Sequence, residues 1–216
     1  MIYVAEANEP ATFDTKVRQP GLRAIAEMVG EQPPRNAGRR FEKVAERREH
    51  IPSSRFPTYW TKCLPELETS YGYICAYSCF RIHPVTGAAS VDHMAPKSRA
   101  WHRVYEWNNY RLACSRLNAR KNSFEDVMDP FEIEDGWFQL ELVGFTIIPN
   151  PQLPRSRQRQ IEDTVRRLGL DDFADDRALD AENYWSREIT IKILRSESPF
   201  VAMELQRQGR LNSGDE

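Results

Sequence analysis

Two stretches of the sequence decide the fold: Val91-Asp-His-Met-Ala-Pro96 and Asn109-Tyr-Arg-Leu-Ala-Cys-Ser-Arg-Leu-Asn-Ala-Arg-Lys121. The β-prone runs at residues 89–91 and 110–113 predict strands. A helix-capable stretch from residue 116 to about 127 follows Ser115, a possible N-cap. Neighbouring residues of a strand point to opposite faces unless the strand ends there. If the strand ends at this aspartate and histidine, one side chain can bind a metal ion while the other contacts a water molecule.

The side chains of these stretches have the chemistry of a site that hydrolyses phosphodiesters. The Asp92 carboxylate and the Asn118 carboxamide oxygen are hard ligands suited to Mg²⁺. A neutral imidazole such as His93 is a natural base for removing a proton from an attacking water at neutral pH. Asn118, Lys121 and Asn122 are spaced i, i+3 and i+4, on one face of the predicted helix. If Asn118 bound a metal ion on that face, Lys121 would bring its positive charge toward the same substrate phosphate.

This pattern resembles the HNH endonuclease family. The resemblance extends over roughly residues 73–129, about a quarter of the chain. It is carried by Cys75 and Cys79, by Asp92-His93-x-x-Pro96, by Trp107-Asn-Asn109-Tyr-Arg-Leu-Ala-Cys114 and by Asn118-x-x-Lys121. The resemblance implies a ββα-metal finger, in which a two-stranded hairpin and a helix clamp one divalent ion. We therefore expect an α+β protein with this finger between mainly helical N- and C-terminal regions.

The resemblance also implies a role for each matching residue. His93 would be the general base, and Asp92 a metal ligand beside it. Asn109 would brace the long connecting loop, with its backbone carbonyl orienting the His93 ring. Asn118 would be the second metal ligand, which makes this an H-N-N variant that holds one Mg²⁺ or Mn²⁺ ion. The residues expected to bind the phosphate of DNA are Lys121, Arg120 and Arg116.

The cysteines depart from the family pattern. Many members carry two CxxC pairs that hold a structural zinc, whereas here the first pair is Cys75-x-x-x-Cys79 and the second is Cys114-x-x-Leu117. Three thiols at altered spacing make a poor tetrahedral zinc site. We expect the cysteines to be small buried hydrophobic residues instead of zinc ligands. His83 is the alternative that would supply a substitute ligand.

The composition is that of a soluble globular chain. Of 216 residues, 40% are apolar and 29% are charged. The longest apolar run, residues 142–148, stops at Pro149, far short of the roughly 20 residues that a membrane-spanning helix needs. The N-terminal sequence shows neither the basic nor the apolar region of a secretory signal. We therefore expect a cytoplasmic protein with reduced cysteines and no membrane partner.

Charge is distributed unevenly, although the formal net charge is only −2. Residues 92–121 contain seven Lys or Arg against two acids, whereas residues 122–142 contain seven acids and no Lys or Arg. This pattern indicates a localised anionic ligand or, alternatively, two differently charged solvated faces. Trp101, Tyr105 and Trp107 lie in the connecting loop, where they would either stack on splayed bases or anchor the loop to the core.

The sequence divides into three predicted regions. Residues 1–72 form an N-terminal arm with helices predicted at 22–29, 38–49 and 58–72. Residues 73–149 form the nuclease core, with further strands predicted at 73–77, 137–143 and 145–148. Residues 150–216 form a helical region, with helices predicted around 161–168 and at 184–194 and 200–211.

The function that these observations predict is metal-dependent hydrolysis of DNA phosphodiester bonds, by nicking or by double-strand cleavage. The family mechanism implies 5′-phosphate and 3′-hydroxyl products. Two alternatives stay open: a catalytically silent DNA-binding or scaffold subunit, and a nuclease directed at RNA. Stand-alone HNH proteins of this size resemble effectors of bacterial anti-phage defence, often paired with an ATPase. By this analogy we expect DNA as a partner, with such an ATPase as a further candidate.

Overall fold

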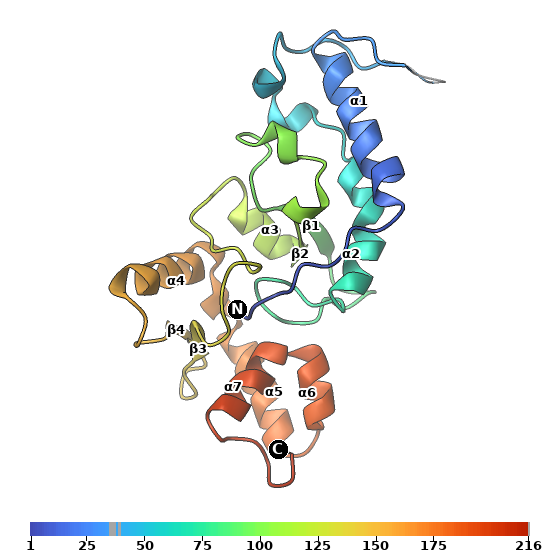
Figure 1. The fold of residues 1–216 in the computed structure, drawn as a ribbon. Helices are drawn as coiled ribbons and strands as arrows, with labels where there is room; N and C mark the ends of the chain where they lie inside the picture. Colours follow the sequence, from blue (N-terminus) through green and yellow to red (C-terminus); the bar gives the residue numbers. More distant parts are fainter. Residues whose placement is uncertain (35–37, 39, 216) are drawn as a thin grey trace.

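A computed structural model describes residues 1–34, 38 and 40–215. The chain combines helices with two small antiparallel sheets, so the expected α+β class is correct. Figure 1 shows an elongated molecule with the first N-terminal helix at one end, a central unit, and a helical region at the other end. None of the helices in these residues is both long and apolar enough to cross a membrane.

The central unit is a two-stranded sheet followed by a helix. Strand β1 (Ala89–His93) pairs antiparallel with β2 (Tyr110–Cys114), with Val91 opposite Leu112 and His93 opposite Tyr110. Helix α3 (Ser115–Lys121) begins directly after β2 and packs on both strands. It is shorter than expected, because the backbone leaves the helix at Asn122, where φ is 47°. Its N-cap is Cys114, one residue before the serine proposed for that position.

The strand expected at residues 73–77 is wrong. Positive φ angles at Tyr73 and Cys79 reverse the chain direction, and only an isolated bridge between Ile74 and Arg81 remains. The N–H of Cys75 donates to the carbonyl of Phe80, which closes a tight turn. These β-prone residues therefore form a knuckle that packs beside β2, where the N–H of Ala76 donates to Leu112.

The N-terminal region contains α1 (Gln19–Met28), which continues a π-helical turn at Asp14–Arg18, and α2 (Leu64–Ser70), which follows a 3₁₀ helix at Tyr59–Cys63. Pro65 lies in the first turn of α2, as expected. The helix expected at 38–49 is wrong over its described residues. This segment lies extended against α1, and its backbone N–H groups donate to the carbonyl of Met28. Arg39, which belongs to the predicted helix, lies outside the described residues. Only a 3₁₀ turn, Arg48–His50, occurs there.

The C-terminal half contains a β-hairpin and four helices. Strands β3 (Phe138–Leu140) and β4 (Ile147–Pro149) pair antiparallel. The helices are α4 (Arg155–Leu168), α5 (Ala174–Trp185), α6 (Ile191–Glu197) and α7 (Pro199–Arg207). The single helix expected at 184–194 is wrong: α5 ends at Trp185, and the side chain of Thr190 caps a new helix.

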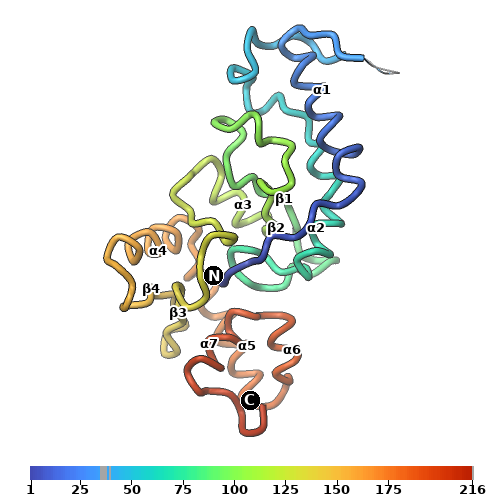
Figure 2. The backbone as a smooth tube through the Cα atoms, in the orientation of Figure 1, coloured from blue at the N-terminus to red at the C-terminus, as the bar shows by residue number. Residues whose placement is uncertain are grey.

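The loop between β1 and β2 is fixed by buried aromatic side chains. The Tyr105 hydroxyl donates to the carbonyl of Pro57 at 2.8 Å, and the Trp107 indole N–H donates to the carbonyl of Ala7 at 2.7 Å. Only 1% of Tyr105 and 3% of Trp107 is exposed, so neither ring is available to stack on a base. Figure 2 shows how the N-terminal segment runs from the middle of the molecule past β2 to α1, and Ala7 lies on this path.

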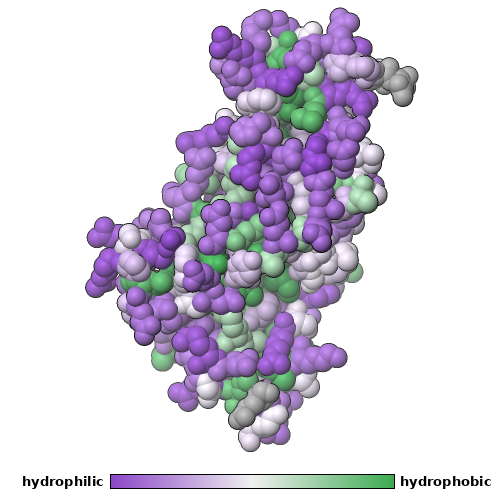
Figure 3. Space-filling model, viewed as in Figure 1, coloured by the Kyte–Doolittle hydropathy of each residue, from purple (hydrophilic) through white to green (hydrophobic). Residues whose placement is uncertain are grey.

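The face shown in Figure 3 is covered mainly by hydrophilic side chains, with smaller apolar patches between them. Large apolar side chains that are exposed include Val85, Val143 and Leu179. These residues lie in the loop before β1, the β3–β4 turn and α5, away from the end of β1. The polar end of β1 is therefore the stronger candidate for a functional site.

Candidate functional site

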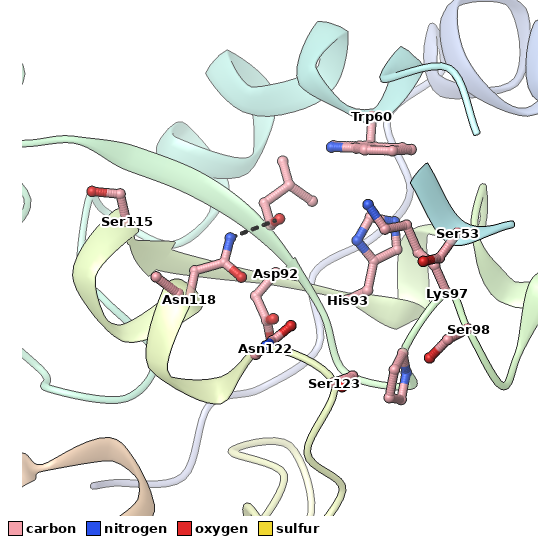
Figure 4. Close-up of a pocket in the computed structure, with 13 residues that line it drawn as sticks. Ser53, Trp60, Asp92, His93, Lys97, Ser98, Ser115, Asn118, Asn122 and Ser123 are labelled. Carbon is pink, nitrogen blue, oxygen red and sulfur yellow. Dashed lines mark hydrogen bonds between the residues drawn. The ribbon is translucent and has the colours of Figure 1, made fainter. Parts of the chain in front are cut away.

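Asp92 and His93 lie at the end of β1, in the wall of an open pocket of about 420 Å³. The pocket lies between β1, α3, the loop after β1 and the N-terminal region. Its lining includes Ser53, Trp60, Asp92, His93, Lys97, Ser98, Ser115, Asn118, Asn122 and Ser123 (Figure 4). The structure thus brings together three of the sequence-predicted site residues, Asp92, His93 and Asn118.

One ring nitrogen of His93 is held by the backbone, and the other is open. Nε2 lies 3.0 Å from the carbonyl oxygen of Val104. Because a carbonyl only accepts, Nε2 must carry the hydrogen and Nδ1 the lone pair. Nδ1 has no hydrogen-bond partner among the described residues and is not a buried unsatisfied atom, so it is accessible from the pocket.

The imidazole ring is packed between aromatic residues. Trp60 meets it edge to face at a centroid distance of 4.8 Å, and Tyr110 does so at 5.1 Å. Burial, followed by the positive charge of Lys97, lowers the pKa of His93 to about 3. The ring is therefore neutral at pH 7, the state in which Nδ1 can accept a proton.

Asn109 braces the connecting loop, but not in the way expected. Its side chain is fully buried, with Oδ1 accepting from the N–H of Ala95 at 2.8 Å and Nδ2 donating to the carbonyls of Ala95 and Arg103. Its own carbonyl accepts from the N–H of Met94. The expectation that this carbonyl orients His93 is wrong, because that carbonyl belongs to β-pairing at the strand end and Val104 takes its place.

Asp92 is buried and shared between two donors. The Tyr77 hydroxyl donates to Oδ2 at 2.5 Å, and the Lys121 ammonium donates to Oδ1 at 3.3 Å. Burial raises the pKa of Asp92, and the positive charge of Lys121 opposes this effect. Each carboxylate oxygen has two lone pairs, so these bonds leave capacity for a further ligand on the pocket side.

Lys121 does not lie where the sequence places a phosphate ligand. Its side chain is fully buried, and Nζ also donates to the carbonyls of His93 at 2.8 Å and Met94 at 3.3 Å. The helical spacing i to i+3 from Asn118 is correct, but the long lysine stem reaches under the strand end instead of into solvent. Lys121 is the internal counter-charge of Asp92.

The two arginines of α3 are also engaged. Arg120 donates to Asp172 at 2.5 Å and to the carbonyls of Leu168 and Gly169, and Arg116 donates to Asp172 at 3.1 Å. Neither arginine lines the pocket. The expected phosphate-binding set is therefore not assembled around Asp92 and His93.

Asn118 is the second candidate metal ligand. Its Nδ2 donates to Ser90 Oγ at 3.1 Å and to the carbonyl of Val91 at 3.2 Å, which turns Oδ1 the other way (Figure 4). Oδ1 has no partner among the described residues and is not buried unsatisfied. Asp92 and Asn118 therefore present hard oxygen donors to one pocket, and this donor set fits a Mg²⁺-type cation that keeps most of its waters.

A metal ion here would depend on water or substrate for its other ligands. Among the described residues, no three His, Cys, Asp or Glu side chains form a group suited to a metal ion. Of the three cysteines considered for a zinc site, Cys114 and Cys75 lie together, because the N–H of Cys114 donates to Cys75 Sγ at 3.4 Å. Cys79 Sγ instead points to the carbonyl of Tyr77. His83 hydrogen-bonds within its own loop, to Thr86 and Val85.

Lys97 is a pocket residue whose role the sequence did not reveal. Its Nζ lies 4.3 Å from the centroid of the Trp60 ring, and its side chain lines the pocket. It forms no ion pair with an acid of the described residues, and burial lowers its pKa. The signal available in the sequence was its position directly after Pro96 in the Asp-His-x-x-Pro motif. Trp60 and Ser53, which lie on the N-terminal side of the pocket, gave no such signal.

No protein-family model matches the sequence, and a search of curated proteins likewise finds no match.

Proposed function

We propose that this protein is a metal-dependent endonuclease of the HNH type that hydrolyses phosphodiester bonds in DNA. One observation carries the proposal: β1 and α3 place the open Nδ1 of His93 in the same pocket as the oxygen donors of Asp92 and Asn118. The order of elements, two antiparallel strands followed directly by a helix, supports a ββα-metal finger. Mg²⁺ or Mn²⁺ is the cofactor that this donor chemistry favours.

The residues divide the chemistry among them. His93 accepts the proton of the attacking water at Nδ1, while its Nε2–H stays on the carbonyl of Val104. Asp92 and Asn118 would hold the divalent cation, which when bound stabilises the charge that develops on the phosphate and on the leaving 3′ oxygen. The Lys97 ammonium would bind a non-bridging phosphate oxygen. Trp60 restrains both Lys97 and His93.

The low pKa of His93 fits a site that is completed by its substrate. Without a ligand, His93 faces the positive charges of Lys97 and Lys121 from within an apolar cage. An anionic phosphodiester would neutralise Lys97 and favour the protonated imidazole, which raises the pKa of His93 toward the range of an effective base. The basicity of His93 would thus increase when DNA occupies the pocket.

Cleavage of supercoiled plasmid tests the proposal. Wild type with Mg²⁺ or Mn²⁺ should nick or linearise the plasmid, and EDTA or His93→Ala should abolish cleavage. His50→Ala is the matched control, because His50 is exposed and lies outside the pocket. End labelling should find 5′-phosphate products, and 5′-hydroxyl ends would contradict the mechanism. Metal binding without cleavage by any variant would favour a silent DNA-binding subunit, and preferential cleavage of an RNA competitor would redirect the proposal to RNA.

A further inference from the structure

The turn that ends α3 holds a non-glycine residue in a backbone conformation that favours glycine. The N–H of Phe124 donates to the carbonyl of Lys121 at 2.9 Å, which closes a four-residue turn. Its first central residue, Asn122, has φ 47° and ψ −125°. These angles are those of a type II′ turn, whose first central position is normally glycine. A side chain there is strained, because Cβ crowds the backbone.

Nothing in the fold requires the Asn122 side chain. The backbone N–H of Asn122 donates to the carbonyl of Asn118 at 2.9 Å, which ends the helix, and glycine would make the same bond. The carboxamide is exposed and forms no hydrogen bond with the described residues. Strain that the fold does not use is characteristic of a residue kept for a ligand.

The position of the side chain indicates which ligand. Asn122 lines the same pocket as Asp92, His93 and Lys97. Figure 4 shows Asn122 beside Asp92, whereas Lys97 lies on the side of His93 and Trp60. Among the described residues that line the pocket, Lys97 is the only cation. A phosphodiester held by Lys97 on one side would leave its other non-bridging oxygen facing the side of Asn122.

We propose that the Asn122 carboxamide binds the scissile phosphodiester, with Nδ2–H donating to a non-bridging oxygen on the side of the pocket opposite Lys97. This assignment rests on the proposed nuclease function and adds a substrate-contacting residue to it. Donation is the role we assign, because Asp92 and Asn118 already present oxygen donors for a cation, and the amide group can donate to phosphate beside the Ser123 hydroxyl, which lines the same pocket. The turn holds the amide in place at the expense of local backbone strain.

Two substitutions distinguish the effect of the Asn122 side chain from the effect of its backbone conformation. Asn122→Gly removes both the carboxamide and the strain, so its melting temperature should rise by about 2–4 °C while kcat/KM for plasmid cleavage falls about tenfold or more. Asn122→Asp keeps a residue that tolerates positive φ but replaces the donor with an anion. It should lose cleavage at least as strongly as the glycine variant. Arg187→Gly is the matched control, because Arg187 also has a positive φ, 65°, but is exposed and outside the pocket.

A binding measurement makes the outcomes distinguishable. Affinity for a short DNA duplex is measured with Ca²⁺ in the His93→Ala background, with and without Asn122→Gly, and the added substitution should weaken binding about tenfold. If wild type cleaves DNA and Asn122→Gly is stabilised yet binds and cleaves equally well, the assignment of Asn122 fails alone. The assignment of Asn122 also fails alone if Asn122→Asp cleaves DNA like wild type. If wild type neither binds nor cleaves DNA, the nuclease proposal fails and the assignment fails with it.

Discussion

Asp92 and His93 are adjacent in the chain but have opposite electrostatic surroundings. Asp92 has an internal cation, Lys121, and a hydroxyl donor, Tyr77. His93 has a single carbonyl partner and two cations nearby, and no acid hydrogen-bonds to it. The carboxylate therefore keeps a charged partner, whereas the imidazole is held neutral. This contrast gives each residue a distinct response to substitution and to pH.

Lowering the pH should destabilise the protein through His93. In the unfolded chain the pKa of His93 is near 6.5, and in the folded protein it is about 3. Between these values the unfolded state binds the extra proton, so stability is full above pH 6.5 and falls by about 1.4 kcal/mol per pH unit as the pH decreases. Urea denaturation in EDTA from pH 7.5 to 4.5 measures this slope. His93→Gln should lose this contribution to the pH dependence of stability. Equal slopes in both proteins would contradict the prediction.

Removing Lys121 should cost far more stability than its place in the Asn118-x-x-Lys121 motif suggests. Lys121→Met leaves Asp92 buried without its cation, and we expect a loss of about 3–5 kcal/mol in the free energy of unfolding. The double variant Lys121→Met with Asp92→Asn should recover part of this loss, because the unpaired charge is gone. Denaturant titration of the three variants and wild type gives the coupling energy. Additive losses would show that the two side chains do not depend on each other.

At the scale of elements, the turn after α4 restrains α3. Asp172 lies in the 3₁₀ helix Leu170–Phe173 and binds both Arg116 and Arg120. The pKa of Asp172 is lowered mainly by its hydrogen bond with Arg120. The arginines that the sequence assigned to phosphate are therefore neutralised by an acid from the C-terminal half.

Asp172→Ala should remove the acid that neutralises these guanidinium groups and strengthen DNA binding, while Arg120 keeps its bonds to the carbonyls of Leu168 and Gly169. We expect affinity to rise several-fold and the slope of log K against log salt to become steeper by about 1–2, because each new phosphate contact adds about 0.9. The free energy of unfolding should change little, since the ion pairs are exposed. Fluorescence anisotropy at several salt concentrations measures both quantities. Asp163→Ala, which breaks the exposed pair with Arg166, is the control; an unchanged slope for Asp172→Ala would mean that these arginines do not meet DNA.

At the scale of the whole molecule, the N-terminal region completes the pocket. Trp60 precedes β1 by many residues, yet its ring contacts His93 and Lys97. Trp60→Phe should lower the free energy of unfolding by about 1–2 kcal/mol and reduce cleavage about tenfold, because a misplaced base and phosphate ligand lose their alignment. Plasmid cleavage and denaturant titration measure the two effects. Trp185→Phe, at a tryptophan that is 36% exposed, should change neither.

The sequence predicted the central elements well because their signals are local. The apolar strand residues and the run to Lys121 specified β1, β2 and α3 in order. It also named Asp92, His93 and Asn118, which share one pocket. The partners of these residues could not be read from spacing: Tyr77 comes from a knuckle that looked like a strand, and Asp172 comes from beyond α4. Tertiary contacts, not local preference, decide where Lys121 and Lys97 point.

The backbone contact of His93 restricts where a proton can go. A carbonyl can hold the Nε2 hydrogen but brings no negative charge to balance a protonated ring, unlike the carboxylate of a Ser-His-Asp arrangement. The same carbonyl of Val104 also accepts the hydroxyl of Tyr110 at 2.8 Å, and no acid of the described residues hydrogen-bonds to the ring. A proton taken up at Nδ1 therefore has a single exit, back through the pocket to the departing product or to solvent. In the proposed hydrolysis, a product that leaves slowly would therefore also delay the return of His93 to its neutral form.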